Sequence, residues 1–361
     1  MWRAPAGLMQ FPSASPDPPD EAALAVRIDA AGSLAELQPA ARRIDTLIVT
    51  WRDAGVPIER IAGAVSSLNA RLFSRAWSLL APPEWVANTC LVVMGSEGRG
   101  EQLLKTDQDN ALLLRDGFEP AGIDAIDVIA ERFSAALIDF GYPRCPGNIM
   151  LSNPLWRQPV AGFKATLRGW MFDGDADGAM DLAIFLDAAP VAGDAALLQD
   201  ALHFIDAYLV DNDAFFARFA AAADQFDAGR SWWARVAAFC AADEAPLDLK
   251  KLGTFPIVHG VRALALQHHV HERATGARLR VLAERGHLAA SMAHDLTVAL
   301  HVLMALKLDH QLRRRNAFDV IDNLVRPAEL AATERDTLKE ALAVVRHFRQ
   351  HLRLHYRLDA L

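Results

Sequence analysis

The chain has 361 residues, of which 37 are Lys or Arg and 45 are Asp or Glu, so its formal net charge is −8. Hydrophobic residues make up 52% and charged residues 23%, which excludes an intrinsically disordered chain and allows two or three domains with buried cores. Residues 1–250 have a net charge of −14 and residues 251–361 a net charge of +6. The acidic charge of residues 1–250 excludes general binding to a nucleic-acid backbone, which needs a clustered basic surface. The protein could still bind a small polyanionic ligand, held by metal ions in the acidic part and by cationic side chains in the basic part.

Cysteine spacing and apolar runs exclude several further classes of protein. Cys90, Cys145 and Cys240 are widely spaced and include no C-x-x-C pair, which excludes a disulfide framework and a thiolate zinc site. The longest apolar runs fall far short of the ~20 residues that span a bilayer. Residues 1–20 contain five prolines and no apolar core of signal-peptide length. We therefore expect a flexible lead over 1–20 and a cytoplasmic protein with no membrane partner.

The remaining chain divides into three predicted segments. Residues 21–85 are expected to be helical, because apolar residues recur at helical spacing over 34–48 and 58–72. Pro39 lies inside the first pattern and is expected to kink that helix or to mark its start. Residues 86–192 mix strand and helix patterns, and residues 193–361 have an almost wholly helical pattern.

The middle segment alternates short apolar runs with helical patterns. We predict strands at 88–94, 111–114 and 180–186, and helices at 123–140 and 155–171. The first of these strands is followed at once by a glycine-rich turn, and the second follows two closely spaced aspartates. The chemistry is therefore expected where these strands begin and end.

The glycine-rich turn and the aspartates form the main candidate site. Gly95 allows the backbone to approach a ligand closely, and Ser96 is expected to begin a helix whose free N–H groups bind a phosphate. Asp107 and Asp109 precede the next apolar run, and residues two apart on a strand face the same side. Two close carboxylates repel each other unless a cation lies between them, and Mg²⁺ bound to carboxylates and substrate phosphates is the usual solution. The alternative is a polar turn without a ligand.

The segments Gly95-Ser-Glu-Gly-Arg-Gly-Glu-Gln102 and Thr106-Asp-Gln-Asp-Asn110 resemble the signature of polymerase-β-type nucleotidyltransferases. The full sequence of these two segments resembles more narrowly a bacterial family of nucleotidyltransferases, which is similar to the nucleotidyltransferase domain of PII-protein uridylyltransferases. The segments Cys145–Trp156 and Leu247–Leu266 extend the resemblance, which covers roughly residues 35–355. It implies an α+β, polymerase-β-like domain with a small mixed sheet over 86–192, flanked by an N-terminal helical segment and a C-terminal helical bundle.

The resemblance implies a two-metal site with Mg²⁺, or Mn²⁺ as an alternative. Asp107 and Asp109 would hold the nucleotide-bound ion, and Asp187 at the end of the predicted strand 180–186 would help to hold the second. Asp181 has the same strand parity as Asp187, but is interpreted as the start of the strand. Relatives often have an Arg two residues after the third aspartate, where this chain has Ala189.

Six further positions are predicted nucleotide contacts. The resemblance places Gly95, Ser96 and adjacent amides at the β- and γ-phosphates, with Arg99 and Lys105 nearby. Lys250 and Arg262 of the helical part would neutralise the leaving pyrophosphate. Ordinary ion pairing is the alternative for Arg99, Lys105 and Arg262, and solvation is the alternative for Lys250.

The resulting hypothesis is a nucleotidyltransferase that moves UMP or AMP from UTP or ATP to a hydroxyl, on a protein acceptor, in bacterial signalling. The alternative is a regulatory module that binds a nucleotide without turnover, and a homo-oligomer is left open. All 12 histidines follow residue 200. His294-Asp295 is similar to the doublet of metal-dependent phosphohydrolases, but no convincing partner set accompanies it. The stripe of His347, His351 and His355 is interpreted as a helix face.

Overall fold

The computed structural model describes residues 20–119, 123–173, 176–209, 212–224, 246–317 and 322–360. The described residues up to 209 form one compact unit, the N-terminal unit, and those from 212 onward form a second, the C-terminal unit. The predicted lead falls outside the described residues, apart from Asp20, and so does Cys240. The division near residue 210 differs from the predicted boundary after residue 192, because α9 (Ala195–Tyr208) packs on the strands of the N-terminal unit.

The N-terminal unit contains helices and four short strands. The helices are α1 (Glu21–Ala30), α2 (Leu34–Asp53), α3 (Ile58–Leu80), α4 (Pro83–Asn88), α5 (Gly95–Gly98), α6 (Ile123–Asp139), η1 (Pro154–Trp156), α7 (Val160–Phe172), α8 (Ala176–Phe185) and α9. The strands are β1 (Thr89–Val93), β2 (Asn110–Leu114), β3 (Arg157–Pro159) and β4 (Ala189–Gly193).

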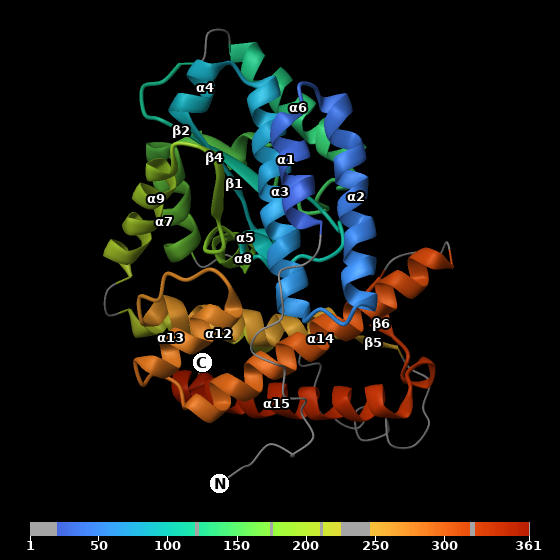
Figure 1. Cartoon of the computed structure of the whole chain (residues 1–361). Helices are drawn as coiled ribbons and strands as arrows, with labels where there is room; N and C mark the ends of the chain where they lie inside the picture. Colours follow the sequence, from blue (N-terminus) through green and yellow to red (C-terminus); the bar gives the residue numbers. More distant parts are fainter. Residues whose placement is uncertain are drawn as a thin grey trace. The chain divides into compact units, whose positions relative to one another are not determined.

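The four strands form one mixed sheet in the order β3-β2-β1-β4. The central strand β1 runs antiparallel to both β2 and β4, whereas β2 and β3 are parallel. Every residue of β1 and β2 is buried, because helices cover the sheet on both sides: α1 to α3 lie on one side and α7 and α9 on the other (Figure 1). The predicted α+β architecture with a small mixed sheet and helical flanks is confirmed.

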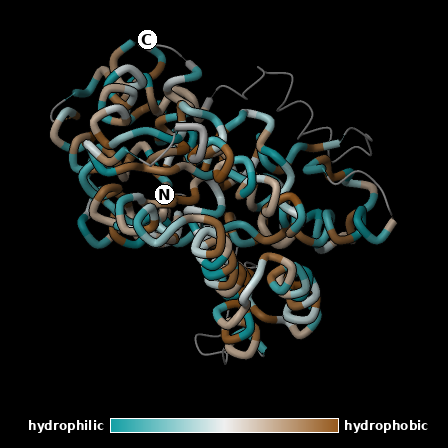
Figure 2. The backbone as a smooth tube through the Cα atoms, turned by 90° about the horizontal axis from the view of Figure 1, so that it is seen from above, coloured by the Kyte–Doolittle hydropathy of each residue, from teal (hydrophilic) through white to brown (hydrophobic). Residues whose placement is uncertain are grey.

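The predicted helices at 34–48 and 58–72 are present as α2 and α3 and extend further. The side chain of Ser33 accepts a hydrogen bond from the Glu36 N–H and caps α2, which satisfies one of the free donors of its first turn. Pro39 lies within the second turn of α2 and neither ends the helix nor marks its start. Trp51 and Trp77 are fully buried in this layer. Figure 2 shows hydrophilic and hydrophobic residues following one another along the helical turns of the chain.

One predicted element of the middle segment is wrong, and a second begins later than predicted. The run 180–186 is not a strand but the second half of α8, so Asp181 lies within a helix and shares no strand face with Asp187. The strand on that side of β1 is β4, which begins two residues after Asp187. The predicted helix 155–171 begins only at Val160, because residues 154–156 form a single 3-10 turn and residues 157–159 pair with β2 as β3.

The C-terminal unit is helical, as predicted. Its elements are α10 (Asp213–Ala221), η2 (Ala222–Asp224), β5 (Leu247–Asp248), the π-helix η3 (Lys250–Thr254), α12 (Phe255–Gln267), α13 (Thr275–Glu284), α14 (Ala290–Asn316), β6 (Leu324–Val325), η4 (Pro327–Glu329), α15 (Ala332–Tyr356) and η5 (Leu358–Ala360). Helix α12 is buried over most of its length and contacts α10, α13 and α15. Among the described helices, none is both long and apolar enough to cross a membrane.

Candidate functional site

Three chain segments meet at one edge of the sheet. β1 ends at Val93, which pairs with Asn110 at the start of β2 and with Ala189 at the start of β4. Because β1 is antiparallel to both neighbours, its last residue lies beside their first residues. The turn α5 that follows β1, Asp109 just before β2, and Asp187 shortly before β4 therefore share this edge.

Gly95 fits closely against Asp109. The Met94 N–H donates a hydrogen bond of 2.9 Å to the Asp109 carbonyl, which fixes the two segments side by side. Gly95 has φ +57°, and a Cβ at this position would lie 2.6 Å from Oδ2 of Asp109. Glycine is required here both for the left-handed backbone and for the space that the carboxylate occupies.

Asp107, Asp109 and Cys145 form a cluster of potential metal ligands. One ligand atom from each lies within 4.8 Å of the others. Burial raises the pKa of the Cys145 thiol to about 12, and the charge and hydrogen bond of Asp109 add to this effect. The two carboxylates supply the hard oxygen ligands that Mg²⁺ requires, and a thiol does not. The donor set therefore fits Mg²⁺ held by Asp107 and Asp109 together with oxygens of a substrate.

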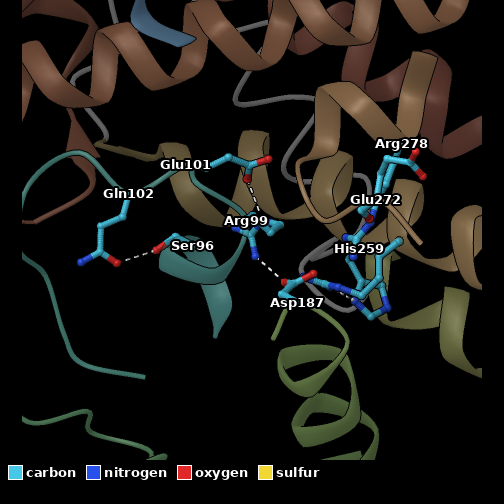
Figure 3. A network of polar contacts seen from close by, with 9 residues as sticks. Ser96, Arg99, Glu101, Gln102, Asp187, His259, Glu272 and Arg278 are labelled. Atoms are coloured by element: carbon cyan, nitrogen blue, oxygen red, sulfur yellow. Dashed lines mark hydrogen bonds and ion pairs between the residues drawn. The ribbon is translucent and has the colours of Figure 1, made fainter. Parts of the chain in front are cut away.

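Asp187 occupies a separate position in a buried ion-pair network. Its fully buried carboxylate accepts a 2.5 Å bond from Nη1 of Arg99, and Nε of Arg99 donates to Glu101 at 2.6 Å. Figure 3 shows Arg99 between these two carboxylates. Burial disfavours the charged guanidinium, but the two carboxylates outweigh this effect and raise the pKa of Arg99 above its ordinary value. Within the described ranges Asp187 is not a member of the Asp107–Asp109–Cys145 cluster.

Backbone packing fixes Asp187 at this edge. Gly98, the last residue of α5, lies so close to Asp187 that a Cβ on Gly98 would overlap the Asp187 carbonyl oxygen, 2.1 Å away. This contact ties the end of the glycine-rich turn to the segment before β4. The metal-binding role predicted for Asp187 stays a prediction, and its ion pair with Arg99 is the interaction that the structure adds.

Ser96 and Lys105, two predicted nucleotide contacts, form hydrogen bonds within the N-terminal unit. The Ser96 hydroxyl donates a 2.9 Å hydrogen bond to Oε1 of Gln102 (Figure 3). Lys105 donates from Nζ to the Ala41 carbonyl at 2.7 Å and to Asp45 at 2.8 Å, so it ties the loop after α5 to α2. The predicted contact of Lys105 with a nucleotide would require these bonds to α2 to break.

A buried hydrogen-bond network that was not predicted from the sequence contacts Glu97 of α5. Nδ2 of Asn69 donates to Glu97 at 3.0 Å, and the Tyr142 hydroxyl donates to Oδ1 of Asn69 at 2.6 Å. Burial raises the pKa of Glu97 to about 8, although the hydrogen bond from Asn69 opposes the shift. Spacing along the chain could not reveal this set, because its members come from α3, α5 and the segment after α6.

The two predicted cations of the C-terminal unit lie on consecutive elements, the π-helix η3 and the helix α12. Lys250 begins η3, and Arg262 is buried in the following helix α12. Nε2 of His259 is 2.7 Å from the Phe219 carbonyl, which can only accept, so Nε2 carries the proton and Nδ1 accepts from Arg262 at 3.2 Å. Arg262 is thereby held in place from one side. Its nucleotide contact and that of Lys250 stay predictions.

The histidine alternatives find no geometric support among the described residues. His294 and Asp295 lie in α14, but the described side chains near them form no group of three potential metal ligands. His351 and His355 lie on α15 with rings 6.0 Å apart, and His355 bonds to Gln267 at 2.9 Å. They belong to a packed helix surface, in agreement with the interpretation as a helix face.

Comparison with protein families agrees with this architecture. Residues 42–177 match the family described as "Putative nucleotidyltransferase DUF294", and residues 213–356 match the "Putative nucleotidyltransferase substrate binding domain". The first match contains Gly95, Asp107 and Asp109 and ends before Asp187, and the second lies in the C-terminal unit. A search of curated proteins gives no significant match. With both matched regions in their expected order and the glycine-rich turn beside the aspartates, the chain belongs to this nucleotidyltransferase family.

Proposed function

We propose that the protein transfers a nucleoside monophosphate, UMP or AMP, from UTP or ATP to a hydroxyl of an acceptor, and that the acceptor is a protein. The observation that supports this most directly is the close fit of Gly95 against Asp109, with Asp107 beside it. This fit brings the glycine-rich turn, the candidate phosphate-binding segment, next to two carboxylates that could hold Mg²⁺.

In this proposal Asp107 and Asp109 hold Mg²⁺, or Mn²⁺ in its place. That ion would neutralise phosphate charge on the nucleotide, and a second ion would lower the pKa of the acceptor hydroxyl. The Gly95 backbone and the Ser96 hydroxyl contact the phosphates. Asp187 is the candidate to hold a second ion or to accept the hydroxyl proton, and Arg99 orients its carboxylate through the 2.5 Å bond.

The test is transfer of label from α-phosphate-labelled NTPs to protein in the presence of Mg²⁺. Asp107→Asn and Asp109→Asn keep the side-chain size and remove the charge, so the rate should fall by at least about 100-fold. The matched control is Asp139→Asn, an exposed aspartate at the end of α6, which should retain the wild-type rate. Unchanged labelling in both Asp107→Asn and Asp109→Asn would exclude the proposal.

A regulatory module without turnover is the second candidate, and Ala189 favours it because relatives often have an arginine there. Ligands that bind the native state raise its stability. A thermal-shift comparison of the four NTPs with and without Mg²⁺ therefore identifies the nucleotide in either case. An NTP that raises the Tm without any release of pyrophosphate in the presence of acceptor proteins would favour the regulatory module.

A further inference from the structure

Cys145 lies beside both predicted metal-binding carboxylates. The described residues contain a single cluster of three potential metal ligands, and its members are Asp107, Asp109 and Cys145, with ligand atoms mutually within 4.8 Å. Neither Cys145 nor any histidine was a predicted ligand, because the wide cysteine spacing excluded a site built from several thiolates. The fold instead combines one sulfur with two carboxylates from a segment about 40 residues away along the chain.

Backbone pairing sets the position of Cys145. The N–H of Gln108 donates to the Pro143 carbonyl at 3.1 Å, and the N–H of Asn110 donates to the Ile149 carbonyl at 3.1 Å. These two bonds hold the loop 143–149 against the residues on either side of Asp109. A third bond, 2.9 Å from the Asn148 N–H to the Cys145 carbonyl, closes the turn within the loop. The main chain therefore holds the loop that carries Cys145 next to the segment that carries Asp109.

We infer that Asp107, Asp109 and Cys145 together bind a thiophilic divalent cation of the zinc class, in competition with Mg²⁺. Carboxylate oxygens accept Mg²⁺, Mn²⁺ and Zn²⁺ alike, whereas a sulfur ligand adds affinity only for the softer ions. On binding, a sulfur–metal bond forms and the thiol proton leaves to solvent. The inference shares two residues with the proposed function, and it makes zinc-class ions antagonists of any Mg²⁺ that the same carboxylates hold.

The probe is Cd²⁺ added to the full-length protein in Mg²⁺-free buffer, with the ultraviolet charge-transfer band between thiolate and Cd²⁺ as the readout. The band reports only sulfur ligands, so cadmium on the histidines of the C-terminal unit does not contribute. We expect a saturable band that excess Mg²⁺ reduces. In Cys145→Ser, which keeps the size and removes the sulfur, the band should vanish and Cd²⁺ affinity should fall by at least about tenfold.

The chain offers a matched control because it contains only two other cysteines, Cys90 and Cys240. The double variant Cys90→Ala/Cys240→Ser keeps Cys145 as the sole thiol and should retain the band. Mn²⁺ affinity, followed by electron paramagnetic resonance, should change by less than about threefold in Cys145→Ser, because Mn²⁺ prefers oxygen ligands. Circular dichroism of each variant checks that it is folded.

Two results would overturn the inference: a wild-type protein without a thiolate band, or a band that persists in Cys145→Ser. Either result is separable from failure of the proposed function. Labelling by NTP that depends on Asp107 and Asp109, together with no thiolate band, would leave a carboxylate-only Mg²⁺ site. A thiolate band without any labelling would leave a zinc-class site in a protein that is not a transferase.

Discussion

Gly95 is required for its backbone conformation and for the space beside it, and substitutions can distinguish these two requirements. Its φ of +57° strains any side chain, and its missing Cβ leaves the space next to Asp109. Gly95→Ala should lose about 1–2 kcal/mol of unfolding free energy from the left-handed backbone. It should also displace the Asp109 carboxylate, so Mn²⁺ affinity and transfer rate should both fall by at least about tenfold. Urea unfolding, metal titration and NTP labelling measure the three effects.

Gly55 provides the matched control for this substitution. It has φ +72°, and a Cβ placed on it would meet no atom within 4 Å. Gly55→Ala should therefore cost a similar unfolding free energy and leave Mn²⁺ affinity unchanged. Equal metal affinities in the two variants would mean that the contact with Asp109 is irrelevant to the site.

Glu97 should make the stability of the N-terminal unit decrease as the pH rises. Burial raises its pKa from 4.5 to about 8, so between these values the folded state binds a proton that the unfolded state has lost. The stabilising contribution is complete below pH 4.5 and disappears as the pH rises through 8. Glu97→Gln, which keeps an oxygen acceptor for Asn69, should be more stable than the wild type at pH 8 by at least about 1.4 kcal/mol, the equivalent of one pKa unit.

The measurement is urea unfolding of both proteins from pH 5 to pH 8, compared as a difference at each pH so that the other groups cancel. Glu101→Gln is not a suitable control because Glu101 bonds to Arg99, whereas Glu84→Gln at an exposed position of α4 is suitable. A pH-independent difference between Glu97→Gln and the wild type would show that Glu97 is ionised in the folded protein.

At the scale of elements, long periodic segments were predicted correctly, whereas of the three short apolar runs predicted as strands two are strands, β1 and β2, and the third is helical. α2 and α3 have unambiguous helical spacing over several turns. The run from Met180 to Leu186 has only seven residues, and such a run has no period that separates a buried strand from a buried helix. β3 and β4 escaped prediction because each is short and contains a proline, Pro159 or Pro190.

The residues of the candidate site likewise fall into those that the sequence predicted and those that it did not. The sequence signature placed Gly95, Asp107 and Asp109 together, and the structure brings them together. Cys145 and Asn69 could not be found in this way, because their proximity to the turn depends on how the loop 143–149 and helix α3 pack. The ion pair of Arg99 with Asp187 likewise follows from the pairing of β1 with β4, which the wrongly predicted strand concealed.

The connection of the loop after α5 to helix α2 depends on Lys105 and Asp45. The Lys105 side chain is largely buried, and the 2.8 Å bond from its Nζ to Asp45 joins the two elements. Asp45→Asn and Lys105→Met should each destabilise the protein, and the double variant should lose less than the sum, with a coupling energy of at least about 0.5 kcal/mol. Urea unfolding of the four proteins gives this energy, and strict additivity would contradict the coupling.

The same two single variants test whether Lys105 contacts the nucleotide. Asp45→Asn removes the ion pair and keeps the charge of Lys105, whereas Lys105→Met removes that charge. A KM for NTP that rises only in Lys105→Met would support the predicted nucleotide contact. Equal effects of both variants on KM would assign Lys105 to the support of the loop alone.

At the scale of the whole molecule, the two units should respond to pH in opposite directions. Burial, with His287, His355 and His269 adding to it, lowers the pKa of His268 from 6.5 to about 4. The ring of His268 stacks on that of His287 at 3.7 Å. This neutral histidine favours the folded state above pH 6.5, and the contribution is lost as the pH falls through 4. Glu97 in the N-terminal unit has the reverse dependence.

His268→Phe keeps an aromatic ring beside His287 but cannot take up a proton. Its urea midpoint should therefore fall less than that of the wild type between pH 6.5 and pH 4.5. The exposed His203→Phe on α9 should retain the wild-type acid dependence. An identical acid dependence in His268→Phe and the wild type would assign the loss of stability to other groups.

The antiparallel neighbours of β1 also have a consequence for folding. Val93 must face both Asn110 and Ala189 for the glycine-rich turn to meet Asp109, and a shift of one residue in either pairing would turn every side chain of that strand to the opposite face. A compact chain with a slipped strand would retain its helices and much of its core, yet lack the paired carboxylates. Under the proposed function, uptake of Mn²⁺ during refolding should therefore follow the final alignment of the strands and not the formation of the helices.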